Sequence, residues 1–206
     1  RCIGRRPAVT LASARVLEGI YPIRFHDVNE SVAYADRMSR PPTPKLTPEH
    51  LSDIGLFGGL SRETLEVLAS SIPASRVEAG EMVVEEGDTS TQMFVVIAGE
   101  LEVIKRGESG GDVRVAVLGP SDWFGEMSII DVQPRSASVR AVAPTLVLSI
   151  TADHVETLLY RRNVKDYALF IMNIARELSR RLRVADGILA QFYAALSHQY
   201  GSPPGR

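Results

Sequence analysis

The segment FGEMSIIDVQPRSASVRA, residues 124–141, gathers groups that can bind a small phosphorylated ligand. Gly125 has no side chain, so the backbone can approach a ligand closely there. The residues EMSII that follow predict a short helical turn, whose N-terminus presents unpaired amides and the positive end of a dipole to an anion. Arg135 adds a planar, permanently charged guanidinium that can grip a phosphate with two hydrogen bonds, and Ser136 adds a hydroxyl.

Glu126 is unexpected beside an anion, because its carboxylate would repel a phosphate. A carboxylate does accept hydrogen bonds from neutral hydroxyls, and a ribose carries such hydroxyls. A carboxylate for a sugar, with amides and Arg135 for a phosphate, describes a nucleotide site. The alternative is an exposed salt bridge between Glu126 and Arg135 across a β-turn, which would contribute little to stability. Residue types alone leave both interpretations open.

The composition is that of a globular protein with a core. The chain has 206 residues, of which 45% are hydrophobic and 23% are charged, and its net charge of −2 argues against a general polyanion binder. The single cysteine, Cys2, excludes an intrachain disulfide and argues against a cysteine-based metal site. No apolar run approaches the roughly 20 residues of a membrane span. We therefore expect a cytoplasmic protein, and the first residue, Arg1, is consistent with a fragment of a longer one.

Changes in composition divide the chain into three parts. Residues 1–46 are predicted to form an N-terminal arm with a candidate helix at 29–38, and they run into the proline-rich linker RPPTPKLTP, residues 40–48. Residues 47–163 are predicted to form a β-roll with flanking helices. Residues 164–206 are predicted to form a long C-terminal lid or dimerisation helix and a tail.

Two short helices are predicted before the strands. Thr47 is a candidate cap, followed by a proline and a glutamate in the first turn. Ser61 caps the second helix, where Leu60 and Leu65 are spaced for a hydrophobic staple.

Short apolar runs separated by glycines predict an antiparallel sandwich or barrel between residues 77 and 150. The fold class is therefore α+β, an antiparallel, jelly-roll-like β-roll flanked by N-terminal helices and a long C-terminal helix. Alternation at Val113, Val115 and Val117, and at Ala137 and Val139, predicts which side chains face inward. The predicted strands are 82–84, 93–98, 101–104, 113–118, 137–142 and 145–150.

The helical period returns at residue 152, with a short helix at 152–160 and a long one at 164–196. The apolar stripe of the long helix has coiled-coil spacing with a stutter near Leu182. Its N-terminal half is predicted either to lie on its own β-roll or to face a partner chain, and beyond Leu182 a partner chain is the expected cover. The stripe comprises Tyr167, Ile171, Ile174, Leu178, Leu182, Ala185, Leu189, Phe192 and Leu196.

Residues 56–196 resemble the cyclic nucleotide-binding domain, the module of catabolite activator proteins, regulatory subunits of cyclic AMP-dependent kinase and cyclic nucleotide-gated channels. The resemblance is carried by EAGEMVVEEGDTSTQMFVVIAGELEVI, which looks like the entry to the β-roll, and by FGEMSIIDVQPRSASVRA, which looks like the phosphate-binding cassette.

The resemblance implies a role for each matching residue. Glu126 would hold the ribose 2′-hydroxyl, the backbone from Gly125 to Ser128 would offer amides, and Arg135 with Ser136 would bind the cyclic phosphate. Val103, Val115 and Met127 would line the base pocket. The candidate ligand-binding residues are Phe124, Gly125, Glu126, Met127, Ser128, Arg135, Ser136, Ala137, Val103, Val115 and Asp186.

The chain departs from the family pattern at one loop residue and at a pair of residues on the long helix. Ser121 stands where family members often have glycine, so either Gly119 takes over the turn or the loop before the cassette shifts. Ala185 and Asp186 replace two small hydroxyl residues that contact the adenine amino group in catabolite activator proteins. An aspartate can accept from adenine but pairs better with guanine, whereas a solvated helix position is the alternative interpretation. The expected ligand is cyclic AMP (cAMP), with cyclic GMP (cGMP) close behind.

The resemblance implies a regulatory sensor and not an enzyme, whose ligand closes the long helix over the β-roll and signals to an unidentified effector. A homodimer through the long helix is expected. No metal site is expected, because the four histidines do not have the spacing of metal ligands. No helix-turn-helix follows the long helix, so neither DNA nor membrane binding is expected of this chain. The alternative is a structural or interaction protein of the same fold that has lost its ligand. A basic stretch on the long helix is interpreted as a solvated face or a partner patch: Arg176, Arg180, Arg181 and Arg183.

Overall fold

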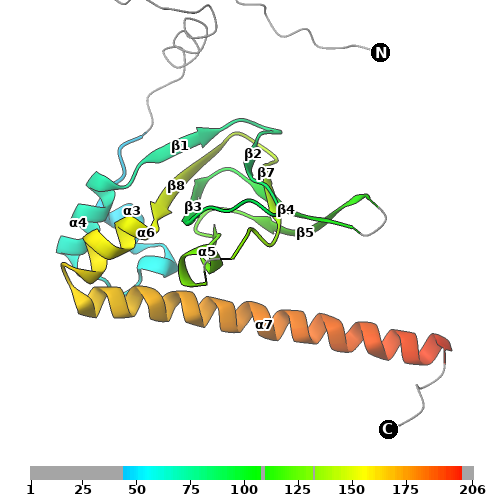
Figure 1. Cartoon of the computed structure of the whole chain (residues 1–206). Coiled ribbons are helices and arrows are strands. Elements are labelled where there is room, and N and C mark those ends of the chain that lie inside the picture. Colours follow the sequence, from blue (N-terminus) through cyan, green and yellow to red (C-terminus); the bar gives the residue numbers. More distant parts are fainter. Residues whose placement is uncertain (1–43, 108–109, 132, 201–206) are drawn as a thin grey trace, which may run out of the picture. The chain divides into compact units, whose positions relative to one another are not determined.

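The computed structural model describes residues 44–107, 110–131 and 133–200. The chain divides into two units, Arg1–Pro44 and Lys45–Arg206, and the second contains the described fold (Figure 1). The helix predicted at 29–38 lies outside the described residues.

Two antiparallel sheets of four strands confirm the predicted β-roll (Figure 1). The first sheet has the order β1 (Ala74–Val77), β8 (Thr145–Thr151), β3 (Gln92–Ala98) and β6 (Trp123–Phe124). The second has the order β2 (Met82–Val84), β7 (Ser138–Ala141), β4 (Leu101–Arg106) and β5 (Asp112–Leu118). Buried side chains from both sheets pack into one cluster: Val77, Val84, Phe94, Val96, Leu101, Leu118, Phe124, Val139, Ala141 and Val147.

All six predicted strands are present, and two strands were missed. Strand β1 escaped prediction because three of its four residues are partly or fully exposed, so it has no apolar pattern. Strand β6 is only two residues long and is defined by its pairing with β3. Both strands depend on tertiary pairing more than on local sequence.

The predicted inward orientation of Val113, Val115 and Val117 is wrong. These side chains are 54%, 54% and 48% exposed, whereas Leu118 is buried. In the register of β5 with β4, Leu118 lies opposite the fully buried Leu101. Alternation shows which residues share a face of a strand, but the pairing partner decides which face meets the core. At β7 the prediction holds, because Val139 is buried.

The predicted helix starts before the strands are confirmed. In α3 (Pro48–Ser52) the Thr47 hydroxyl accepts from the His50 amide at 3.4 Å, and in α4 (Arg62–Ser71) the Ser61 hydroxyl accepts from the Thr64 amide at 3.3 Å. A 3₁₀ turn, η1 (Gly55–Phe57), separates them. The predicted helix at 152–160 is a short α-helix, α6 (Ala152–His154), continued by a π-helix, η2 (Val155–Tyr160).

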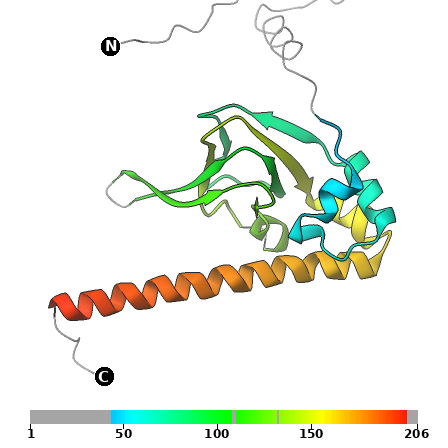
Figure 2. The same ribbon diagram turned by 180° about the vertical axis from the view of Figure 1, so that it is seen from behind.

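Helix α7 (Val164–Tyr200) has a docked N-terminal half and an exposed C-terminal half. Phe170 and Ile174 are fully buried, and the Asn173 side-chain amide donates to the carbonyls of Leu56 and Gly58 at 3.1 and 2.9 Å. The helix then continues past the β-roll (Figures 1 and 2). Of the two alternatives left open for the N-terminal half, the structure shows the one in which it packs on its own domain. The exposed apolar residues of the C-terminal half are Leu182, Val184, Ile188, Leu189, Phe192 and Tyr193.

A buried carboxylate fixes the first turn of α7. Asp166 is 2% exposed and accepts hydrogen bonds from the Ser61 amide at 3.1 Å, the hydroxyls of Ser61 and Thr64, and the Asn163 side-chain amide at 3.0 Å. Burial raises the pKa of Asp166, but the bonds from Ser61 and Thr64 outweigh it, so the pKa is lowered overall. The start of α7 is therefore tied to the start of α4.

Within the described part of the chain, no helix is long and apolar enough to cross a lipid bilayer. Among the same residues, no group of three His, Cys, Asp or Glu side chains is placed to hold a metal ion.

Candidate functional site

A cavity of about 720 Å³ lies between the segment 124–137, the inner face of the β-roll and α7. Its size is in the range of ligand pockets in proteins. Nine of the eleven candidate site residues line it, and Val115 and Asp186 do not. The lining contributed by α7 is Glu177, Leu178, Arg180, Arg181, Leu182 and Ala185.

Gly125 occupies a position that only glycine fits. Its φ is +79°, a conformation that residues with a side chain rarely adopt. A Cβ atom there would overlap the Arg135 guanidinium and lie 3.0 Å from the Gln92 carbonyl oxygen. The absent side chain therefore lets the arginine pack against the backbone at the entrance to the cassette.

The short helix predicted after Gly125 is present as α5 (Met127–Ile130). The Ser128 amide donates to the Gly125 carbonyl at 3.2 Å, so of the segment Gly125 to Ser128, which the resemblance expects to offer amides, this one already has a partner. The Ser128 hydroxyl is buried and lines the cavity.

The Arg135 guanidinium is buried and held by the chain itself. Nη1 donates to the Gly125 carbonyl at 3.3 Å and to the Ser128 hydroxyl at 3.1 Å. Nη2 donates to the Gln92 carbonyl at 2.6 Å and to the Ser90 hydroxyl at 2.5 Å. The side chain is thereby fixed in one orientation at the cavity.

Two further features define the electrostatics of Arg135. Its Nε is buried and has no hydrogen-bond partner among the described residues. Its guanidinium carbon lies 5.9 Å from the centre of the Phe94 ring, a cation–π distance. Burial lowers the pKa of Arg135, while Asp88 and Glu126 raise it, and an arginine with such neighbours remains charged at neutral pH.

Glu126 is 3% exposed and faces α7. Its Oε1 lies 3.4 Å from Arg181 Nη1, whereas its Oε2 is buried without a hydrogen-bond partner in the described part of the chain. Burial raises the pKa of Glu126, and its backbone hydrogen bond and Arg181 lower it less. No ion pair joins Glu126 to Arg135, both of which are described and buried, so the alternative of an exposed turn salt bridge is wrong.

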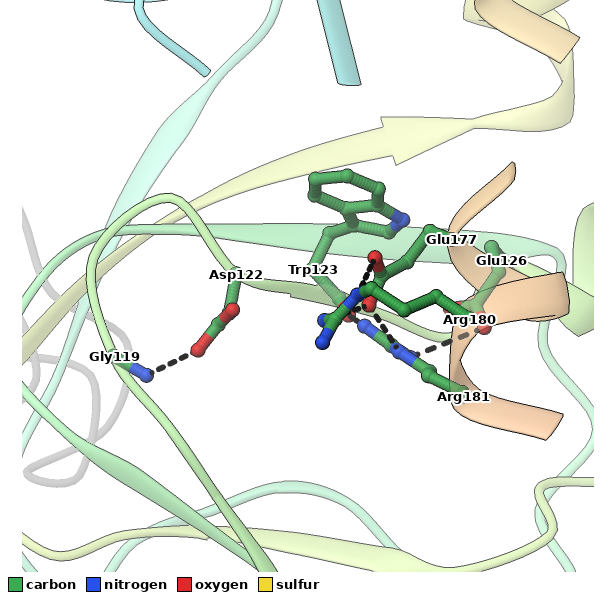
Figure 3. Close-up of polar contacts among 7 residues, drawn as sticks. All are labelled: Gly119, Asp122, Trp123, Glu126, Glu177, Arg180 and Arg181. Carbon is green, nitrogen blue, oxygen red and sulfur yellow. Dashed lines mark hydrogen bonds and ion pairs between the residues drawn. The ribbon is translucent and has the colours of Figure 1, made fainter. Parts of the chain in front are cut away.

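Arg181 connects α7 to the cassette (Figure 3). Its Nη2 donates to the Trp123 carbonyl at 2.7 Å, and its Nε donates to Glu177 Oε1 at 2.8 Å. Arg180 also pairs with Glu177, at 2.7 Å, but its side chain is 63% exposed. Of the predicted basic stretch, Arg181 therefore faces the site, a role that the sequence interpretation missed. The available signal was its spacing of four from Glu177, which places both on one helix face.

Ala116 and Ala185 take the places predicted for Val115 and Asp186. Val115 points outward on β5, and its neighbour Ala116, paired with Val103, lines the cavity instead. Asp186 is exposed and does not line the cavity, in agreement with a solvated helix position, whereas Ala185 does line it. The remaining candidates Ser136 and Met127 are exposed at the rim.

Ser121 adopts the backbone conformation that glycine would prefer. Its φ is +72°, and its amide donates to the Val96 carbonyl at 2.9 Å. The neighbouring Asp122 carboxylate accepts from the Gly119 amide at 2.8 Å (Figure 3). The loop before the cassette is thus held by hydrogen bonds around a serine in the left-handed region.

The family model described as "Cyclic nucleotide-binding domain" matches residues 74–162, which include the β-roll and the cassette. The two sheets and the cassette lie within this segment, so residues 74–162 form a domain that matches the cyclic nucleotide-binding domain. The family is one of regulatory domains that bind cyclic nucleotides.

Three known proteins are similar to this chain. It is 28% identical over 142 residues to the CRP-like cAMP-activated global transcriptional regulator of Mycobacterium tuberculosis. The aligned region covers 69% of this chain and 61% of the relative. It is 32% identical over 131 residues to the cyclic AMP receptor protein of Thermus thermophilus. The aligned region covers 64% of this chain and 58% of the relative. The crystal structure of a cyclic nucleotide-binding domain from Methylobacillus flagellatus superposes with a TM-score of 0.64 at 29% identity, over 70% of this chain and 83% of that one. The chain thus spans about three fifths of the curated relatives it matches.

Proposed function

We propose that the domain binds a cyclic nucleotide, with cAMP ahead of cGMP, and that the ligand holds α7 on the β-roll. The observation that supports this proposal most strongly is a pair of buried, unpartnered groups in two residues that line one cavity. Glu126 Oε2 can accept a hydrogen bond from a ribose hydroxyl, and Arg135 Nε can donate one to a phosphate oxygen. A buried polar atom without a hydrogen bond is destabilising, so a ligand that supplies a partner for both atoms is favoured.

The preference for cAMP rests on the relatives. The Mycobacterium tuberculosis regulator is described as cAMP-activated, and the Thermus thermophilus protein as a cyclic AMP receptor. We extend that ligand to this chain because the cassette offers a carboxylate and a cation in the same cavity.

We propose binding and not catalysis for this cavity. The buried hydroxyl beside Arg135 belongs to Ser128, and it accepts a hydrogen bond from a cation, so it is not activated by a base. In the described residues around the cavity, no second carboxyl group lies free to act with Glu126, because Asp122 and Glu177 are engaged by Gly119 and by Arg180 and Arg181.

The proposed signal is a change in how firmly α7 sits on the cassette. Arg181 already bridges to Trp123 and Glu126, and Leu178 and Leu182 line the cavity from the helix. A bound nucleotide would contact both the cassette and this helix face, so it would bind the docked arrangement better than an undocked one. A ligand shifts such an equilibrium by its difference in affinity for the two states. An effector, as a partner or a linked domain, would read the position of α7.

We further propose that a second copy of the chain covers the exposed half of α7. Leu182, Leu189 and Phe192 belong to one apolar stripe with coiled-coil spacing and are 62%, 51% and 59% exposed. The same stripe would serve an interaction protein without a ligand, which remains the alternative function.

Calorimetric titration of the chain with cAMP separates the two functions. The unchanged chain is expected to bind, and Arg135→Ala is expected to lose about 2–5 kcal/mol of binding free energy, at least a roughly 30-fold loss of affinity. Arg140→Ala is the matched control, because Arg140 pairs with Glu102 at 2.6 Å and does not line the cavity. Arg135→Lys keeps a cation and serves as a second variant in case Arg135→Ala does not fold. Circular dichroism tests whether all three variants are folded. No heat of binding for the unchanged chain would favour the interaction protein.

A further inference from the structure

The two sides of the cavity differ in chemistry. The buried polar residues of the cavity, Glu126, Ser128 and Arg135, all lie in the cassette. Helix α7 adds Glu177, Arg180 and Arg181, which pair with one another or, for Arg181, also with Glu126 and Trp123. Strands β4 and β5 and the helix α7, which runs past the cassette beneath these strands (Figures 1 and 2), contribute mainly aliphatic side chains. These include Val103, Ala116, Leu118, Leu178, Leu182 and Ala185.

The charged groups that border this aliphatic side are already engaged within the protein. Asp122 accepts from the Gly119 amide at 2.8 Å. Arg180 makes two hydrogen bonds to Glu177, at 2.7 and 2.9 Å, and its side chain is largely exposed. Gln133 is polar, but it is exposed and belongs to the cassette. A ligand group placed between β5 and α7 therefore meets mainly aliphatic side chains, together with charged groups that already have partners.

In a single chain, without the second copy proposed above, the same side of the cavity is open to water. Leu182 is 62% exposed, and Ala185 is exposed as well, although both line the cavity. The hydrogen-bonding edge of a base placed there would keep its contacts with solvent. It would neither lose hydrogen bonds on binding nor gain them from the protein.

We infer that the site reads the phosphate and the ribose and tolerates a change of purine. The inference rests on the proposed function and makes it more specific: cAMP leads cGMP by a small factor only. Sites that hydrogen-bond a ligand group reject an analogue lacking it by large factors, because buried polar groups are left unpaired, whereas apolar pockets discriminate weakly. Here the unpaired buried atoms belong to Glu126 and Arg135, the residues proposed to contact the sugar and the phosphate, while Val103, Ala116 and Ala185 are the side chains available to the base.

Competition calorimetry on the complete chain, with cAMP, cGMP and 2′-deoxy-cAMP, tests this inference. We expect the dissociation constants of cAMP and cGMP to agree within about tenfold, and 2′-deoxy-cAMP to bind more than tenfold more weakly than cAMP. A difference of 100-fold or more between cAMP and cGMP would overturn the inference while leaving the proposed function intact. Equal binding of cAMP and 2′-deoxy-cAMP would remove the role of Glu126 as the sugar contact. If none of the three binds, the proposed function fails, and the inference fails with it.

A variant distinguishes a tolerant pocket from base reading by the helix. Asp186→Ala removes the acid beside Ala185 that would favour guanine if it reached the base. Because Asp186 is exposed and does not line the cavity, the ratio of cGMP to cAMP affinity is expected to change by less than about twofold. A selective loss of cGMP affinity in this variant would show that the aspartate reads the base and would contradict the inference.

Discussion

The two halves of α7 are attached to the domain by different means. The N-terminal half is fixed by buried apolar side chains such as Phe170 and Ile174 and by the satisfied carboxylate of Asp166. Around the cavity, the same helix is held by the half-exposed Arg181, and beyond Leu182 it has no cover among the described residues. The difference suggests a rigid anchor at one end and a ligand-sensitive contact at the other, because exposed ion pairs contribute far less than apolar burial.

The largest expected effect is at the anchor. Phe170→Ala leaves a cavity where a fully buried ring now packs near Phe57, so the free energy of unfolding should fall by about 3–5 kcal/mol. Phe192→Ala is the matched control, because the same residue type is 59% exposed on the same helix and should change stability by less than about 0.5 kcal/mol. Urea denaturation at a protein concentration where the chain is monomeric measures both. Equal destabilisation by the two substitutions would break the comparison.

An intermediate effect is expected at Asp166. Asp166→Asn replaces an acceptor of several hydrogen bonds with a side chain that brings its own donors towards Ser61 and Thr64, so stability at neutral pH should fall by about 1–3 kcal/mol. Because the folded-state pKa of Asp166 is lowered, its ionised form contributes fully above the unfolded value, near 3.8, and the contribution is lost as the pH falls below it. Thermal unfolding of both proteins between pH 2 and 7 should therefore show the gap closing at acid pH. A gap that stays constant across that range would mean that the charge of Asp166 does not matter.

Local signals in the sequence were sufficient for much of the fold and of the site. Thr47 and Ser61 were recognised as helix caps because capping depends on neighbouring amides. Gly125 and Arg135 mark the cassette because the buried guanidinium packs where a side chain at Gly125 would otherwise lie. These features arise within a few residues of one another or from a spacing that the family shares.

The features that escaped prediction depend on contacts between distant residues. The face of Val115 is decided by the pairing of β5 with β4, and alternation alone has no information on that choice. Arg181 meets Glu126 only because α7 docks on the β-roll, so its charge looked like that of any solvated helix residue. The exposed position of Asp186, by contrast, agrees with the solvated helix position that the sequence analysis offered for it beside Ala185 of the stripe.

The smallest effect on stability is expected at the cavity end of α7, where the central claim is also tested most directly. Arg181→Ala should lower the free energy of unfolding by only about 1 kcal/mol, because the side chain is half-exposed. Amide hydrogen exchange of the unchanged chain, with and without saturating cAMP, measures what the ligand does to this region. We predict protection in the cassette and in the stretch of α7 that lines the cavity, with little change around Phe170, and a smaller gain on α7 in the Arg181→Ala variant. Exchange rates that are the same with and without cAMP in both regions would contradict the account.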